Sequence, residues 1–146
     1  MDVGASAVAF VGFGLSSINS LYQLFSSIKD GPKKLADLSG ALRRLQSVFE
    51  QIDTLPDLPD IVRSTPSLAK CLAACRADIG RFDSSLQKLN FSAGERLHGL
   101  MWKRLKIAFG EKDITYMLTI VSAYADSLTL ELNLIQTRAI STPVSE

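Results

Sequence analysis

The sequence has few of the residues that build catalytic, metal or disulfide-rich sites. Its 146 residues include one histidine and two cysteines, which are too few for a metal cluster or a disulfide scaffold. Nine glycines and five prolines exclude collagen-like and low-complexity structure. Sixteen Lys+Arg against fifteen Asp+Glu leave a net charge of +1, so no global field attracts nucleic acid. We expect one compact domain and no nucleic-acid partner.

Charge is missing from one long segment near the N-terminus. The 26 residues from Val3 to Ile28 include no charged side chain. As a helix this segment would be about 39 Å long, which exceeds the ~30 Å hydrocarbon core of a bilayer. Its hydrophobicity is nevertheless modest, because eleven of its positions are Gly, Ser, Asn or Gln.

Two stripes follow the length of this segment. Alternating spacings of three and four predict an apolar stripe that faces a core, formed by Val8, Val11, Leu15, Ile18, Tyr22 and Phe25. Small residues four apart let two helix backbones approach closely, and such residues dominate a second stripe of Ala5, Ala9, Gly12, Ser16, Ser20, Gln23 and Ser27.

Three interpretations of the uncharged segment remain open. A secretory signal does not fit, because Asp2 stands where a basic region is needed and the apolar run is too long. Myristoylation is excluded, since residue 2 is not glycine. The segment is then a buried first helix of a bundle, a constitutive membrane anchor with a polar stripe, or a helix that enters a membrane when released. The first and third interpretations are compatible.

The next part of the chain predicts two more amphipathic helices. Gly31-Pro32 ends the first helix and opens a second, in which Gly40 suggests a close helix contact. The apolar positions of this second helix are Leu35, Leu38, Leu42, Leu45, Phe49 and Ile52. Residues 55–66 hold three prolines and predict a linker with a short turn around Ile61. Thr65-Pro66 would cap a third helix, with apolar residues Leu68, Leu72, Cys75, Ile79, Phe82, Leu86 and Leu89.

Two further helices complete the expected fold. A break at 90–94 precedes a fourth helix over about 95–109, which Gly110 stops. The last helix is expected over about 112–139, with inward residues Ile114, Met117, Val121, Ala125, Leu128, Leu132 and Ile135. We therefore predict an all-α bundle of about five helices over residues 1–140, with a first helix over 2–29 and a frayed tail over 141–146.

No group of residues in the sequence predicts catalysis. Gly12-Phe13-Gly14 has no GKS or GKT after it, so a P-loop is absent. Cys71 and Cys75 lie four apart on the third helix and fit small apolar residues of a core. His98 is the only imidazole, and nothing in the sequence places an acidic residue beside it. We expect no enzyme, no cofactor and no metal.

Basic residues gather in two places that suit contact with anionic lipid. Arg96, His98 and Lys112 flank a run with an aromatic ring, made of Trp102, Lys103, Arg104 and Lys106. Tryptophan is favoured at the depth of lipid headgroups, and each nearby cation adds about 1 kcal/mol of attraction to an anionic leaflet. A second group follows the uncharged segment and comprises Lys29, Lys33 and Lys34. We predict that both groups contact anionic lipid; ordinary solvated surface is the alternative.

The order of these features resembles a known family. The chain opens Met-Asp-Val-Gly-Ala-Ser-Ala-Val-Ala-Phe-Val-Gly-Phe-Gly-Leu, continues after a Gly-Pro break, and later contains Met-Trp-Lys-Arg-Leu-Lys-Ile-Ala-Phe-Gly-Glu-Lys-Asp-Ile. Over nearly its whole length it resembles the HeLo-like domain of fungal NLR-type (STAND) receptors and of their cell-death execution partners. That family is similar to the four-helix bundle of the mixed-lineage-kinase-like pseudokinase.

The resemblance implies a function for the uncharged helix. Release of the helix on oligomerisation would move the protein from the cytoplasm to the plasma membrane, which it would permeabilise in regulated cell death. The membrane-active residues would be Gly4, Val8, Val11, Gly12, Gly14, Leu15, Ile18 and Phe25, with Gly4, Gly12 and Gly14 in glycine-zipper-like positions that Val8 interrupts. Partners would be anionic lipids, further copies of the chain and an NLR-type receptor. The alternative is a non-lytic interaction and oligomerisation module of such a receptor.

Overall fold

Six α-helices account for most of the chain. The computed structural model describes residues 3–29, 31–92, 94 and 99–141. The helices are α1 (Val3–Ser26), α2 (Lys33–Asp53), α3 (Leu58–Ser64), α4 (Pro66–Gln87), α6 (Met101–Ala108) and α7 (Glu111–Ser141), and the described residues form no strand. The all-α prediction is confirmed: the described residues form six helices, where the sequence predicted about five.

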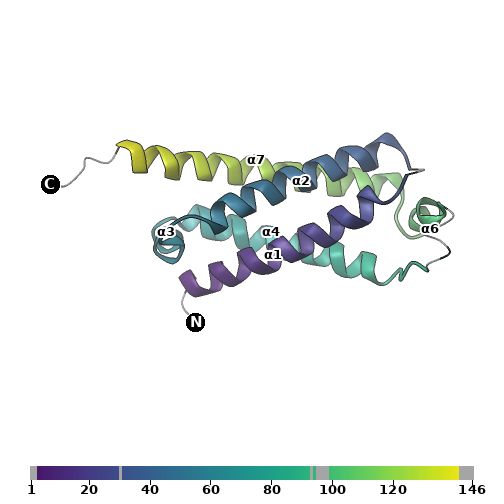
Figure 1. The fold of residues 1–146 in the computed structure, drawn as a ribbon, viewed down its shortest axis with the longest axis horizontal. Coiled ribbons are helices and arrows are strands. Elements are labelled where there is room, and N and C mark those ends of the chain that lie inside the picture. The colour runs from purple at the N-terminus through teal and green to yellow at the C-terminus, as the bar shows by residue number, and fades with distance from the viewer. Residues whose placement is uncertain (1–2, 30, 93, 95–98, 142–146) are drawn as a thin grey trace.

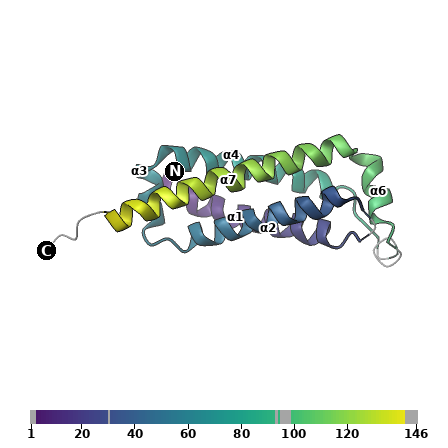
Figure 2. The same cartoon turned by 90° about the horizontal axis from the view of Figure 1, so that it is seen from above.

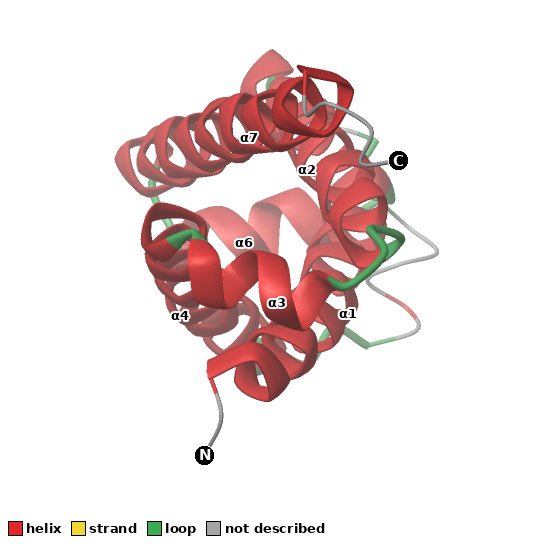
Figure 3. Cartoon of the chain, turned by 90° about the vertical axis from the view of Figure 1, so that its left-hand side faces the viewer, coloured by secondary structure: helices red, strands yellow, loops and turns green. Residues whose placement is uncertain are grey.

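Four long helices form an elongated bundle. The helix α1 contacts α2 and α4, and each of these contacts α7, so α1 and α7 lie diagonally opposite each other (Figure 3). The short helix α3 crosses one end of the bundle and α6 crosses the other (Figure 1). Seen from above, the last turns of α7 extend past the end that α3 covers (Figure 2). The first helix is thus a structural member of the bundle and touches α2, α3 and α4.

The core is built from the heptad-spaced residues of the long helices. All six apolar positions predicted for α2 are buried. In α4 the predicted residues are buried except Phe82, and in α7 they are buried except Ile135. Leu89 was predicted in the same helix as Phe82 but follows the end of α4 at Gln87. Phe82, Leu89 and Ile135 are half-buried and still pack on the core. Apolar rows of this kind cover a shared core when helices cross at small angles.

The proline-containing linker is partly helical, which corrects the prediction of a single turn. Helix α3 starts after Asp57, whose φ of 57° reverses the chain direction, and Pro59 lies in its first turn. Its two buried residues, Leu58 and Val62, close the end of the core. Proline is accepted in a first turn because the amide it lacks would have no helical partner there.

Three other predictions about helix limits and contacts need correction. Helix α6 begins at Met101 rather than near residue 95, because Gly99 has a φ of 67°, which interrupts a helix. Residues 95–98, with Arg96 and His98, lie outside the described residues, as does the tail from 142 onward. Gly40 marks no close contact, since a β-carbon there would meet nothing within 4 Å.

Candidate functional site

The inner face of α1 lies in the centre of the bundle. Val11, Ile18 and Phe25 are buried as the sequence predicted, and Leu21 and Ile28, which the prediction left out, are buried with them. Leu15 and Tyr22 are half-buried. Val8 is 42 % exposed, which corrects its assignment to the core-facing stripe. Burial of this many large side chains stabilises the closed bundle by many kcal/mol.

The two central glycines of α1 lie in opposite environments. Gly14 is buried, and a β-carbon on it would lie 2.3 Å from Cε2 of the Phe49 ring on α2. Gly12 is exposed, and a β-carbon there would meet nothing within 4 Å. The sequence prediction placed both in one glycine-zipper-like set. In the closed bundle Gly14 instead gives room to an aromatic ring of α2, while only Gly12 faces outward.

The outer face of α1 is exposed and uncharged. Phe13 is 61 % exposed, and Val8 is the other exposed large apolar residue of this face. The remaining exposed residues are small or polar and neutral, and include Ala9, Gly12, Ser16, Asn19 and Gln23. The outer face of α2 differs, since its exposed residues include the charged side chains of Lys33, Lys34, Asp37, Arg43, Arg44 and Glu50.

One segment of the described residues could cross a membrane by length and composition. It is Val8–Ser26 of α1, about a third of which is buried inside the bundle. The core helix of a soluble protein meets the same criterion. The exposed neutral face is what distinguishes α1 from an ordinary core helix, because such helices normally carry charges on the side that faces water.

Polar contacts hold the edge of α1 against α4. Ser20 donates a hydrogen bond from Oγ to Oδ1 of Asp83 at 2.9 Å, and Gln87 Nε2 donates to Ser20 Oγ at 3.0 Å. Gln87 also donates to Asp83 Oδ1 at 3.2 Å. On the other side of α1, Arg43 of α2 donates to the hydroxyl of Tyr22 at 3.3 Å. Hydrogen bonds are directional, whereas apolar packing is not, so these contacts help to fix the position of α1.

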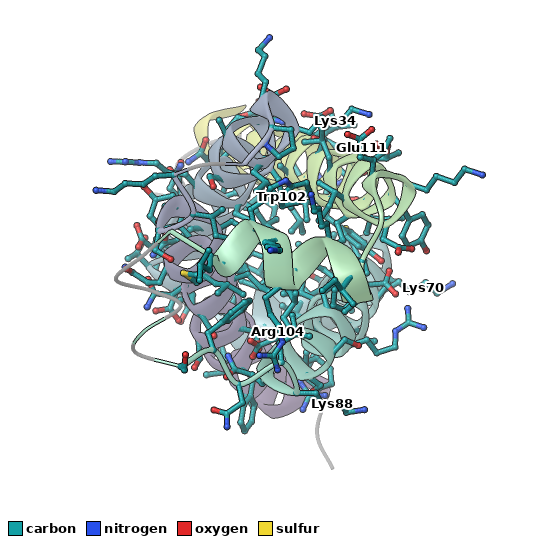
Figure 4. The ribbon with its side chains drawn as sticks, turned by 90° about the vertical axis from the view of Figure 1, so that its right-hand side faces the viewer. Lys34, Lys70, Lys88, Trp102, Arg104 and Glu111 are labelled. Atoms are coloured by element: carbon teal, nitrogen blue, oxygen red, sulfur yellow. The ribbon has the colours of Figure 1, made fainter. Side chains whose placement is uncertain are left out.

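The structure brings the two predicted basic groups to one end of the bundle. Helix α6 lies across the end where α1 finishes and α2 begins, as Figures 1 and 4 show. Ser27 Oγ lies 3.7 Å from Met101 Sδ, which joins the α1 end to the first residue of α6. The cations of this end are exposed: Lys29, Lys33, Lys34, Lys103, Arg104 and Lys106. We call this surface the basic end.

Two cations of the basic end and its tryptophan ring contact other parts of the bundle. Arg104 Nη2 donates to the carbonyl oxygen of Leu89 at 2.7 Å, and Lys34 Nζ donates to Oγ1 of Thr115 at 2.9 Å. Trp102 is half-buried and packs against the core. Ile107 of the same helix is 80 % exposed among the cations. Ile107 is therefore a more exposed apolar residue of the basic end than Trp102.

The two cysteines are unsuited to redox or metal chemistry. Cys75 is buried and Cys71 is half-buried, and both are free thiols. Burial raises the pKa of both thiols above its ordinary value, which disfavours the thiolate form that acts as nucleophile and metal ligand. The described residues hold no cluster of His, Cys, Asp and Glu that could bind a metal ion.

Sequence reasoning missed a cationic groove between α1 and α4. Its basic residues are Arg76 and Arg81 of α4 and Lys88, the residue that directly follows this helix. The spacing of four residues between Arg76, Gly80, Ser84 and Lys88 predicts that they lie along one face of a helix. This spacing was the feature of the sequence from which the groove lining could have been predicted. The sequence could not reveal that this face adjoins α1, because helix neighbours are set by tertiary packing.

Comparison with known proteins gives one match. No curated protein and no solved structure matches the chain. Residues 1–144 match the family described as the N-terminal region of the pigment biosynthesis cluster protein PigL. This match spans all the helices described above, from α1 to α7. The chain therefore belongs to the PigL N-terminal family.

Proposed function

We propose that this chain is a HeLo-like effector domain of regulated cell death, which permeabilises a membrane when α1 leaves the bundle. The observation that carries the proposal is the outer face of α1, which is exposed to water yet has no charged residue from Val3 to Ser26. The opening sequence and the later Trp-Lys-Arg segment, which resemble the HeLo-like family, support the same assignment.

The absence of charge matters because charged side chains oppose entry into lipid. Each Lys, Arg or Asp at the centre of a spanning helix costs about 2.5–3.5 kcal/mol on insertion. Helix α2 carries two exposed lysines, two exposed arginines and three acidic residues, so its transfer would be strongly unfavourable. Helix α1 meets no such penalty on either face. Among the helices described, α1 is the one suited to insertion.

Burial of the inner face keeps α1 in the bundle at rest. Separation of Ile18, Leu21 and Phe25 from the core would expose apolar surface at about 25 cal/mol per Å². Acyl chains can replace that core, and a partner receptor or self-association would raise the local concentration. The trigger therefore acts by bringing copies of the chain together at a membrane. The protein is expected in the cytoplasm at rest and at the plasma membrane after activation.

The basic end supports recognition of an anionic leaflet. Ile107, which is 80 % exposed, lies on α6 with the exposed cations Lys103, Arg104 and Lys106. A cationic surface with a protruding apolar residue is typical of interfacial binding, since the charges attract the headgroups and the apolar group enters the boundary.

Two glycine substitutions with the same chemistry test the proposal. Gly12→Glu places a carboxylate on the outer face of α1, and Gly40→Glu places one on the outer face of α2. Neither position has an atom within 4 Å of the new β-carbon, so both variants should fold. We expect Gly12→Glu to abolish dye leakage from vesicles of phosphatidylcholine and phosphatidylserine, with each copy fused to a dimeriser. Gly40→Glu should leak like the unmodified chain.

Equal leakage by the two variants would show that α1 does not insert through its outer face. Thermal unfolding of both variants, measured first, separates a loss of insertion from a loss of folding. Expression in cells gives a second measure, since only Gly40→Glu should retain toxicity.

A non-lytic interaction module is the second candidate, and the position of α1 favours it. The helix contacts α2, α3 and α4 and buries its inner face in the core, as expected of an element that never leaves. An intact chain that neither binds nor permeabilises anionic vesicles when forced to oligomerise would support this alternative.

A further inference from the structure

A solvent-open groove of about 530 Å³ lies between α1 and α4. Phe13 and Ser17 of α1 form one wall. The other wall and the floor come from α4 and the residue directly after it, and comprise Arg76, Ala77, Gly80, Arg81, Ser84, Ser85 and Lys88. A β-carbon on Gly80 would meet nothing within 4 Å, so the middle of the groove is open.

The lining carries three cations and no carboxylate. Arg81 forms an ion pair with Asp78 of its own helix. Arg76 and Lys88 make no ion pair with any described residue, and both are exposed. Three serine hydroxyls lie among these cations. Guanidinium, ammonium and hydroxyl groups are the donors that proteins use to bind phosphate.

The groove is connected to α1 through Arg76. Its guanidinium carbon lies 4.9 Å from the centre of the Phe10 ring and 5.1 Å from the centre of the Phe13 ring. One cation of α4 therefore contacts two aromatic rings of the helix that the proposed function releases. Cation–π contacts of this kind hold the ring and the cation together while no stronger anionic partner is present.

We propose that this groove binds the phosphate of an anionic phospholipid headgroup, and that Arg76 couples binding to the release of α1. A phosphate can accept charge-assisted, bidentate hydrogen bonds from the Arg76 guanidinium. These hydrogen bonds are stronger than the contacts of the guanidinium with the rings of Phe10 and Phe13. Binding would draw Arg76 from the rings and loosen α1 from α4. The choice of lipid as the source of the phosphate rests on the proposed function.

Binding is tested with a soluble short-chain phosphatidylserine, below the concentration at which it forms micelles. Arg76→Gln and Lys88→Gln should each weaken its affinity about fivefold. Lys70→Gln is the matched control, because Lys70 is an exposed cation of α4 outside the groove and should bind like the unmodified chain. Short-chain phosphatidylcholine should bind more weakly than phosphatidylserine.

Coupling is tested by amide hydrogen exchange in α1. We expect phosphatidylserine to speed exchange in α1 of the unmodified chain. Arg76→Gln should speed it about threefold without lipid, since the ring contacts are lost, and lipid should then add nothing. Lys88→Gln touches neither ring, so its exchange without lipid should be unchanged.

Three results would overturn the inference: affinity that Arg76→Gln and Lys88→Gln leave unchanged, α1 exchange that does not respond to lipid, or equal affinity for inorganic phosphate. None of these measurements uses a bilayer or leakage. Failure here is therefore separate from failure of the Gly12→Glu test.

Discussion

At the scale of single residues, Gly14 and Gly12 show how one helix serves two environments. The space at Gly14 is taken by the Phe49 ring, whereas the space at Gly12 is open to water. A glycine in a helix interior lowers stability by about 0.5–1 kcal/mol relative to alanine. At Gly14 close packing with α2 compensates for that loss of stability. At Gly12 no packing contact of the closed bundle compensates for it.

Alanine substitutions at these two positions should change stability in opposite directions. Gly14→Ala would force the buried Phe49 ring to move, and such overpacking lowers the unfolding free energy by about 1–3 kcal/mol. Gly12→Ala should raise it by about 0.5–1 kcal/mol. Urea unfolding of both variants measures the difference. A change of the same sign in both would contradict the packing of α1 on α2.

The two thiols give the protein a pH-dependent stability. Burial, the larger effect, and the neighbouring Cys71 thiol raise the pKa of Cys75 in the folded protein, so the folded state holds this proton more tightly than the unfolded state. The contribution is complete below about pH 9 and is lost as the pH rises further, by up to about 1.4 kcal/mol per pH unit. Cys75→Ala should make the decline between about pH 8 and pH 10 shallower. An unchanged slope would show that Cys75 is not buried as described.

At the scale of helices, spacing predicted the fold wherever an apolar row was long. The rows of α2, α4 and α7 lie in the core because seven-residue spacing can place them on only one side of a helix. Helix α3 was missed, because its seven residues include Pro59, follow a turn at Asp57 and are too few to form such a row. The start of α6 was misplaced because a glycine gives no sign of its φ angle in the sequence.

The candidate site was less predictable than the helices. The exposed cations of the basic end were found from composition, but their grouping at one end follows from how α6 crosses the bundle. The groove of Arg76 and Lys88 depends on which face of α4 meets α1. Pairings between helices are set by the sum of all contacts, and no single spacing in this chain encodes them.

Locking α1 to α4 should prevent permeabilisation. The side-chain oxygens of Ser20 and Asp83 lie 2.9 Å apart, so Ser20→Cys with Asp83→Cys, in a chain with Cys71→Ala and Cys75→Ala, places two thiols side by side. The oxidised protein should be folded and unable to cause dye leakage, and reduction should restore leakage. Full leakage by the oxidised form would exclude release of α1 as the mechanism.

At the scale of the whole molecule, the positions of the charged residues matter more than the net charge. The net charge is only +1, yet cations gather at the end covered by α6 and in the groove beside α1. Attraction to an anionic surface then depends on orientation, because a Debye length of about 8 Å screens the rest of the molecule.

Removal of two charges from the basic end should weaken binding to anionic vesicles. Lys103→Gln with Lys106→Gln is expected to lower affinity about thirtyfold, from about 1 kcal/mol for each cation. Arg44→Gln with Lys70→Gln removes the same charge from elsewhere on the bundle, at exposed residues that form no hydrogen bond or ion pair with the described residues of α1, and should have a smaller effect. Co-sedimentation with vesicles measures both. Equal losses would mean that net charge alone governs binding.

The fit between Gly14 and the Phe49 ring also bears on how copies of the chain would meet. A molecule whose first helix has departed keeps a vacant apolar trough on α2, shaped for a segment without a side chain opposite the ring. The first helix of a second molecule fits this exposed surface of α2 best, because it is identical to the helix that left. Release of the first helix in one molecule would thus favour its replacement by the first helix of a second molecule, and the chains would assemble by domain swapping.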